Sequence, residues 1–225
     1  GVSASEIEYG MSGVEFTLSY KGKKEHISLA IPGKFSVYNA LTAASCCIAA
    51  GVSLEKIAAG LRAAHGVKGR IEVVKTDTDY TVIIDYAHTP DGLLNILNTI
   101  RGFAKGRIVT LFGCGGDRDK TKRPKMGKIA GELSDFCIVT SDNPRTENPS
   151  AIIDDILVGI SQTDCAYVVI ENRFDAIEFA LDNAKPNDII LLAGKGHETY
   201  QILKDRTIMF DEREIVMKLV DTSEM

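Results

Sequence analysis

The sequence lacks the features that mark several protein classes. No apolar run approaches the roughly 18 residues of a membrane-spanning helix, and the opening GVSASEIEYG has neither the basic nor the apolar region of a secretion signal. The five cysteines are an odd number and form no C-x-x-C pair, which argues against a disulfide framework and against a zinc site. We therefore expect a cytoplasmic protein without membrane insertion.

The chain also lacks an excess of basic residues. It has 26 Lys and Arg against 31 Asp and Glu, which gives a net charge of -5. This balance gives no general case for a nucleic-acid partner, although a local basic cluster can still bind a small anion. Its length and composition are those of an ordinary globular protein with one large or two smaller domains, and we expect a monomer.

Two nucleotide-binding fingerprints are absent. The P-loop pattern G-x-x-x-x-G-K-[ST] occurs nowhere, and GCGGDR does not match G-x-G-x-x-G because Arg118 occupies the last position. The first absence excludes a P-loop within this sequence. The second argues against a nicotinamide-dependent dehydrogenase.

The first 68 residues predict a β-hairpin followed by two helices. Apolar and polar residues alternate in GVEFTLSYKGKKEHISLAI around Gly22, where we expect the turn. SVYNALTAASCCIAA is apolar nearly all round, which predicts a buried helix, and SLEKIAAGLRAA is amphipathic with Ser53 as its N-cap. Asn39 lies in the first helix, where a buried amide needs a partner: the backbone, the incoming loop or the edge of a planar heterocycle.

From about residue 71 the pattern becomes an alternation of strands and helices. The apolar runs YTVIIDYA, RIVTLFG, DFCIVTS, AYVVI and DIILLAG predict strands, and the stretches at 91–103, 123–134, 150–161 and 173–184 have helical periodicity. This alternation predicts an α/β fold in which a mostly parallel sheet carries helices on both faces. Ligands of such sheets bind beyond the carboxyl ends of the strands.

The segments that follow these strands are rich in charge, glycine and histidine. They read DYAHTPD (85–91), GCGGDRDKTKRP (113–124), SDNPRTENP (141–149), ENR (171–173) and GKGHE (194–198). A structural loop needs only turn-forming residues, so we expect these loops to converge on one site. The glycines and cations of 113–124 suit an anion, with a solvated turn and a charged helix start as the alternative.

The DNPR turn has the chemistry of an amino-acid site. Pro144 restricts its own backbone and that of Asn143, so the amide is presented together with the guanidinium of Arg145, whose fork fits a carboxylate. Glu198 can complement Arg145 by accepting an ammonium group. The alternative is a plain turn that carries a surface arginine.

Two further side chains have open interpretations. Asp85 at a strand end suits a ribose hydroxyl or a magnesium-bound water, unless it only caps its loop, and Thr89-Pro90 after it predicts a helix start. His197 is a lone histidine, and such residues are more often structural than catalytic.

Taken in order, these motifs resemble those of the Mur ligases of peptidoglycan synthesis. The likeness rests on IPGKFSVYNALTAA, GVKGRIEVV, DYAHTPDGL, FGCGGDRDKTKRPKMG, TSDNPRTENP and GKGHE, which together span essentially the whole chain. It is strongest to the members that add meso-diaminopimelate to UDP-N-acetylmuramoyl-L-alanyl-D-glutamate. The resemblance implies that residues 1–68 end a central ATP-binding domain and that residues 69–225 form a Rossmann-like, amino-acid-binding domain.

The resemblance also implies the site residues. Those for meso-diaminopimelate are Arg118, Asp142, Asn143, Pro144, Arg145, Gly194 and Glu198, and those for ATP are Asn39, Arg70 and Asp85. Phe35 and Ser36 replace the first two residues of the family's H-N-x-x-N pattern, so only Asn39 transfers. The family's P-loop and its carbamylated lysine have no counterpart here. Mg²⁺ would be held mainly by the rest of the enzyme, and no catalytic residue or metal ligand is assigned in this chain.

The implied reaction activates the D-glutamate carboxylate with ATP as an acyl phosphate, which the diaminopimelate amine then attacks. Family members that add L-lysine usually lack the arginine of DNPR, so this residue indicates a substrate with a distal carboxylate. A chain without a P-loop should be inactive alone. The alternative is a stand-alone module that binds an amino acid or a nucleotide without catalysis.

Overall fold

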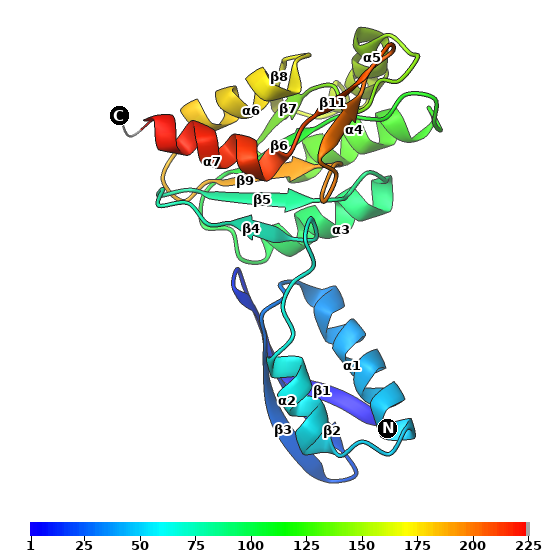
Figure 1. Ribbon diagram of the computed structural model, residues 1–225, viewed down its shortest axis with the longest axis vertical. Coiled ribbons are helices and arrows are strands. Elements are labelled where there is room, and N and C mark those ends of the chain that lie inside the picture. Colours follow the sequence, from blue (N-terminus) through cyan, green and yellow to red (C-terminus); the bar gives the residue numbers. More distant parts are fainter. Residues whose placement is uncertain (224–225) are drawn as a thin grey trace. The chain divides into compact units, whose positions relative to one another are not determined.

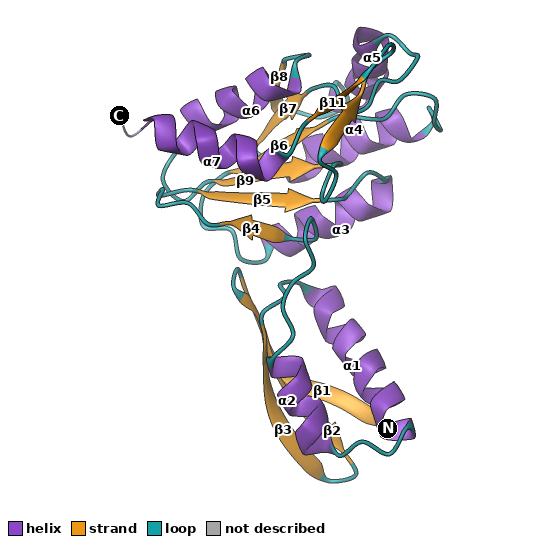
Figure 2. Ribbon diagram, viewed as in Figure 1, coloured by secondary structure: helices purple, strands orange, loops and turns teal. Residues whose placement is uncertain are grey.

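The computed structural model describes residues 1–223 and divides the chain into two compact units, Gly1–Val67 and the part from Lys68 onward. Each unit has its own hydrophobic core. Both are drawn in Figure 1 and, by secondary structure, in Figure 2. Among the described residues, no helix is both long enough and apolar enough to cross a membrane.

The first unit is an antiparallel three-stranded sheet with two helices. Its elements are β1 (Val2–Gly10), β2 (Gly13–Tyr20), β3 (Lys23–Leu29), α1 (Lys34–Ala49) and α2 (Leu54–Arg62). The predicted hairpin is confirmed as β2 and β3, joined by Lys21 and Gly22 with φ of 47° and 80°. Positive φ at both central residues is the type I′ geometry that matches strand twist. The sequence did not predict β1, because its residues are mostly exposed and show little apolar alternation.

The prediction that α1 is a buried helix is wrong. Only one face packs on the sheet, through Ser36, Val37, Ala40 and Ala44, whereas Phe35 and Tyr38 are 53% and 56% exposed. Asn39 is exposed, so its amide has no need of a buried partner. Ser36 is buried and donates a hydrogen bond to the carbonyl oxygen of Pro32 at 2.7 Å. A helix on one side of a small sheet has one covered face, whatever its composition.

The second unit contains a six-stranded sheet in the order β4-β5-β9-β6-β7-β8. Its strands are β4 (Glu72–Val74), β5 (Thr81–Asp85), β6 (Ile108–Phe112), β7 (Phe136–Val139), β8 (Ala166–Val169) and β9 (Ile189–Ala193). All neighbouring pairs are parallel except β4 with β5. The chain steps outward from β5 to β8 and then returns to place β9 between β5 and β6.

Helices cover both faces of this sheet, which confirms the predicted α/β class (Figure 1). One face carries α3 (Pro90–Arg101), α4 (Lys122–Leu133) and α5 (Pro149–Ile160), and the other carries α6 (Arg173–Asp182) and α7 (Glu212–Ser223). The small hairpin β10 (Tyr200–Ile202) and β11 (Thr207–Met209) follows β9. The sequence predicted α3 to α6, but not α7, the hairpin or β4.

Candidate functional site

Loops from the carboxyl ends of β6, β7 and β9 begin side by side. Phe112 at the end of β6 pairs with Val139 of β7 and with Ala193 of β9, so the next residues of all three strands leave the sheet at one edge. The loop after β5 joins them through a hydrogen bond from Gly194 N to Asp85 O at 3.0 Å. This is the convergence that the sequence predicted.

Glycines allow these loops to touch. A Cβ on Gly116 would lie 1.9 Å from the carbonyl oxygen of Pro144. Gly194 has φ of +114°, and a Cβ there would lie 2.8 Å from Asp142 Oδ2. Both positions therefore need glycine for close approach, and Gly194 also needs it for its backbone conformation.

A buried polar cluster lies behind the DNPR turn. Asn143 is 3% exposed, and its Nδ2 donates to Glu198 Oε2 at 3.0 Å. Its Oδ1 accepts from the backbone N of Ile202 at 2.9 Å and from Lys195 Nζ at 3.1 Å. The amide thus connects the loop after β7 with the loop after β9 and with β10.

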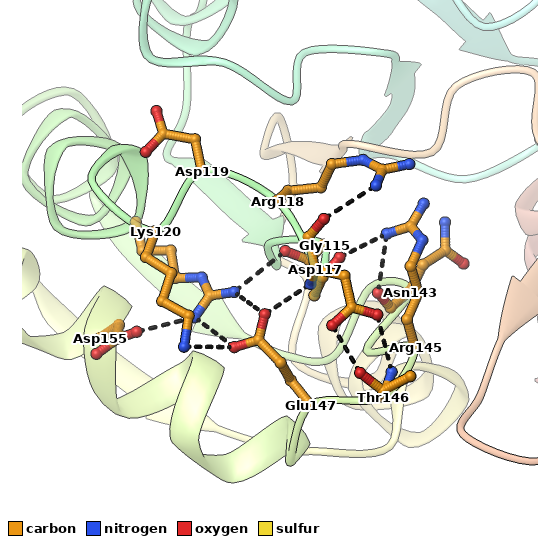
Figure 3. Close-up of polar contacts among 12 residues, drawn as sticks. Gly115, Asp117, Arg118, Asp119, Lys120, Asn143, Arg145, Thr146, Glu147 and Asp155 are labelled. Carbon is orange, nitrogen blue, oxygen red and sulfur yellow. Dashed lines mark hydrogen bonds and ion pairs between the residues drawn. The ribbon is translucent and has the colours of Figure 1, made fainter.

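The side chains of Arg118 and Arg145 both pass close to Gly115, where an added Cβ would lie 3.9 Å from Arg118 Cγ and 2.9 Å from Arg145 Nη1 (Figure 3). Arg145 Nη1 donates to the carbonyl oxygens of Gly116 at 3.0 Å and Asn143 at 3.3 Å, and Arg118 Nη1 donates to Asp117 O at 2.9 Å. Within residues 1–223 the other nitrogens of these two guanidiniums have no hydrogen-bond partner. They can receive a carboxylate.

Two other cations of the 113–124 segment are paired with carboxylates. Arg123, 1% exposed, donates to Glu147 Oε1 at 2.8 Å and Oε2 at 3.1 Å and to Asp155 Oδ2 at 2.9 Å. Lys120 Nζ lies 3.1 Å from Glu147. Bonds from Arg123 hold the pKa of Glu147 down at about 2, so this carboxylate stays charged.

A second tie joins the same two loops. Asp117 Oδ1 accepts from Thr146 Oγ1 at 2.7 Å, and Oδ2 accepts from Thr146 N at 3.2 Å (Figure 3). These bonds lower the pKa of Asp117. Together with the Arg123–Glu147 pair, these bonds hold Thr146 and Glu147, the two residues that follow Arg145, and so fix the loop that carries it.

Asp85 caps its own loop, which is the structural alternative considered for it. It is buried, and its two oxygens accept from the backbone N–H groups of Ile71 and Ala87, both at 2.8 Å. Burial raises its pKa, opposed by those two bonds and by the charge of Arg70. Arg70 is exposed, and its guanidinium carbon lies 4.9 Å from the centre of the Tyr86 ring. The predicted helix start is confirmed, since Thr89 Oγ1 accepts from Gly92 N at 3.1 Å.

Sequence reasoning missed several side chains at this edge. Lys195 was noted only as a charge, yet it is fully buried. Tyr86 was not singled out, but its ring centre lies 4.6 Å from that of His88 and 5.1 Å from that of His197. The motifs DYAH and GKGHE are the signals that contain these residues.

A groove of about 520 Å³ also borders the DNPR turn, and of the predicted site residues only Pro144 lines it.

Comparison with known proteins gives one consistent result. Residues 69–196 match the family described as Mur ligase, glutamate ligase domain. A UDP-N-acetylmuramoyl-L-alanyl-D-glutamate–2,6-diaminopimelate ligase from Caldanaerobacter subterraneus subsp. tengcongensis is 54% identical over 223 residues, which are 99% of this chain and 46% of that protein. A ligase of the same name, numbered 1, from Clostridium acetobutylicum is 52% identical over 221 residues, 97% of this chain and 45% of that protein.

The solved structures agree. A structure of a UDP-N-acetylmuramoyl-L-alanyl-D-glutamate–2,6-diaminopimelate ligase is 33% identical with a TM-score of 0.74, covering 100% of this chain and 46% of that one. The chain thus spans about half the length of the curated relatives it matches.

Proposed function

Because the chain belongs to the Mur ligase family, we propose that it is the part of an ATP-dependent ligase that binds meso-diaminopimelate and presents it to UDP-N-acetylmuramoyl-L-alanyl-D-glutamate. Residues 69–225 form the amino-acid-binding domain in this proposal, and residues 1–68 end the central ATP-binding domain. The match of nearly the whole chain to ligases of that name, at 54% identity, favours this over a stand-alone binding module.

One observation carries the proposal: the site has a cationic end and an anionic end, joined by one residue. Arg145 Nη1 contacts the carbonyl oxygen of Asn143 at 3.3 Å, and Glu198 Oε2 accepts from the side chain of the same asparagine at 3.0 Å. The unpaired guanidinium nitrogens of Arg118 and Arg145 suit a carboxylate, and Glu198 suits an ammonium group. A free amino-acid head group carries both charges.

This arrangement supports meso-diaminopimelate over L-lysine. The distal end of diaminopimelate has a carboxylate and an ammonium group, whereas that of lysine has the ammonium alone. With lysine bound, Arg118 and Arg145 would be left without the anion they face, in a partly covered site. Because Arg118 is exposed and Arg145 is half-buried, the cost lies below that of a fully buried unpaired charge, and we expect discrimination of about tenfold.

The chain's contribution to the reaction is positioning. ATP, when bound, supplies the activation of the D-glutamate carboxylate. Arg70 and Asp85 are the residues of the second unit proposed to contact it, and Asn39 is that of the first. Arg70 fits this role, because its exposed guanidinium lies over Tyr86 and can meet a phosphate or ribose oxygen. Asp85 fits it less directly, because each of its oxygens already accepts a backbone N–H.

No ligand for Mg²⁺ is assigned in this chain. Within residues 1–223 there is no group of three or more His, Cys, Asp or Glu side chains placed to hold a metal ion.

The head-group contacts would hold one end of the amino acid still while its other amine attacks, which is the entropic part of catalysis.

Calorimetric titration of the chain tests the proposal. Meso-diaminopimelate is expected to bind and L-lysine to bind at least tenfold more weakly. Arg145→Ala should lose the preference between them. The matched control is Arg101→Ala, which removes an arginine that pairs with Asp135 just before β7, at the opposite edge of the sheet. Equal affinity for the two ligands, or an Arg145→Ala chain that still discriminates, would overturn the substrate assignment.

A further inference from the structure

Lys195 is a fully buried ammonium group whose three donors are all used. Its Nζ donates to Tyr200 O at 2.7 Å, to Asn143 Oδ1 at 3.1 Å and to Glu198 Oε2 at 3.4 Å. Its side chain is 0% exposed, so it cannot itself reach a ligand. A lysine carries three N–H donors, and three acceptors surround this one.

These contacts determine how Asn143 is oriented. Its Oδ1 faces two donors, Lys195 Nζ and Ile202 N, so rotation of the amide would set its NH₂ group against both of them. The Nδ2 group is therefore directed at Glu198 Oε2. The same oxygen of Glu198 also accepts from Lys195, which leaves Oε1 with no hydrogen-bond partner in the described part of the chain.

Lys195 also sets the charge at this end of the site. Asp142 Oδ1 lies 4.0 Å and Glu198 Oε2 lies 3.4 Å from Nζ, so two carboxylates share one ammonium group. Arg173 and Glu212 are nearby as well, but they pair with each other at 2.7 Å. One formal negative charge remains, which matches one ligand ammonium group. Without Lys195, two carboxylates would be left close together without a cation.

We propose that Lys195 is a positioning residue of the amino-acid site: it holds Asn143 and Glu198 so that Glu198 presents a single oxygen, Oε1, to the ammonium group of the ligand. The identity of the ligand rests on the proposed function, whereas the arrangement of the three side chains is independent of it. Burial lowers the pKa of Lys195, and the neighbouring carboxylates Asp142 and Glu198 oppose this shift.

Carbon-13 NMR of the Glu198 carboxyl group tests the arrangement without any ligand. In Lys195→Met, which keeps the length of the side chain and removes its donors, the Glu198 carboxyl signal at pH 7 should shift, because Oε2 then loses one of its two donors. Lys218→Met, at an exposed position on α7, is the matched control and should leave the signal unchanged. An unchanged Glu198 signal in Lys195→Met would overturn the inference.

Titration with meso-diaminopimelate provides the functional measurement. Lys195→Met should bind at least tenfold more weakly, whereas Lys218→Met should bind as the unmodified chain does. If the unmodified chain binds no diaminopimelate while the Glu198 signal still shifts in Lys195→Met, the proposed function fails and the positioning role stands.

The unmodified chain supplies a second test in case Lys195→Met does not fold. Nitrogen-15 NMR at pH 7 should show the Lys195 side chain as a protonated ammonium protected from exchange. Its signal should shift in Glu198→Gln, which keeps the shape of the side chain. A neutral Lys195 amine at pH 7, or a signal that does not respond to Glu198→Gln, would refute the role.

Discussion

A fully buried ion pair connects the proposed amino-acid site to the core of the second unit. Arg173 Nε donates to Glu212 Oε1 at 2.8 Å, Nη2 lies 2.7 Å from the same oxygen, and the two side chains are 0% and 1% exposed. Arg173 Nη2 also donates to Ala193 O at 3.0 Å, at the end of β9 and directly before Gly194. The pair therefore joins the first turns of α6 and α7 to the loop that carries Lys195 and Glu198.

Removing one member of this pair should be far more harmful than removing both. Arg173→Met would leave the Glu212 carboxylate buried without a partner, which costs about 3–5 kcal/mol of unfolding free energy. Arg173 Nη1 and Glu212 Oε2 already lack hydrogen-bond partners in the described structure. The double substitution Arg173→Met with Glu212→Leu removes both orphan atoms, so its stability should lie within about 1 kcal/mol of the unmodified chain.

Urea unfolding measures this difference. With a denaturant slope of about 2 kcal/mol per molar, Arg173→Met should lower the midpoint of the second unit by about 1.5–2.5 M. Backbone amide signals from β9 report on that unit, and those from β2 report separately on the first. Lys128→Met removes an exposed pair with Glu132 and should change stability by no more than about 0.5 kcal/mol. A double variant as unstable as Arg173→Met would refute the reasoning.

Three further outcomes are expected. Burial alone would raise the pKa of Asp188, but bonds led by Arg107 lower it below the ordinary 3.8. The ionised Asp188 therefore stabilises the fold fully above about pH 4, and this stabilisation is lost as the pH falls further. Acid unfolding of Asp188→Asn should accordingly depend less on pH below about pH 4. Arg145 has φ of +52°, a backbone conformation that glycine adopts without strain. The unfolding free energy of Arg145→Gly should therefore exceed that of Arg145→Ala by about 1 kcal/mol. Equal urea midpoints of the two variants would count against backbone strain. Burial raises the pKa of Cys114 to about 12, so a thiol reagent at pH 8 should label the exposed Cys46 and spare Cys114 until the chain unfolds.

The elements that the sequence predicted are those with a strong local pattern. Five apolar runs became parallel strands, and the four helices between them begin within two residues of the predicted positions. Asn148 and Asn172 act as N-caps of α5 and α6, each accepting backbone N–H bonds, so the helix starts are encoded locally. β4, β10 and β11 have three residues each, which is too short for a periodic signal.

Burial was predicted less well, because it depends on what lies opposite. The composition of α1 indicated a buried helix, yet the residues that contact it come from one side only, and Phe35 and Tyr38 remain more than half exposed. Asn39 shows the same limit for a single residue. Its position in an apolar sequence indicated a buried amide, and its position on the helix makes it exposed.

The site shows most clearly what a single sequence leaves open. Charged residues near DNPR were visible at once, but their partners were not. Arg123 and Arg145 each lie between a proline and a polar residue. Yet Arg123 is paired with Glu147, a residue 24 positions away, whereas Arg145 has guanidinium nitrogens without a partner in the described part of the chain. Which cation can bind a ligand is thus decided by the partners that the fold has already assigned to the others. The same reasoning applies to Glu198. Lys195 and Asn143 both donate to its Oε2, so Oε1 is the oxygen that remains for a ligand.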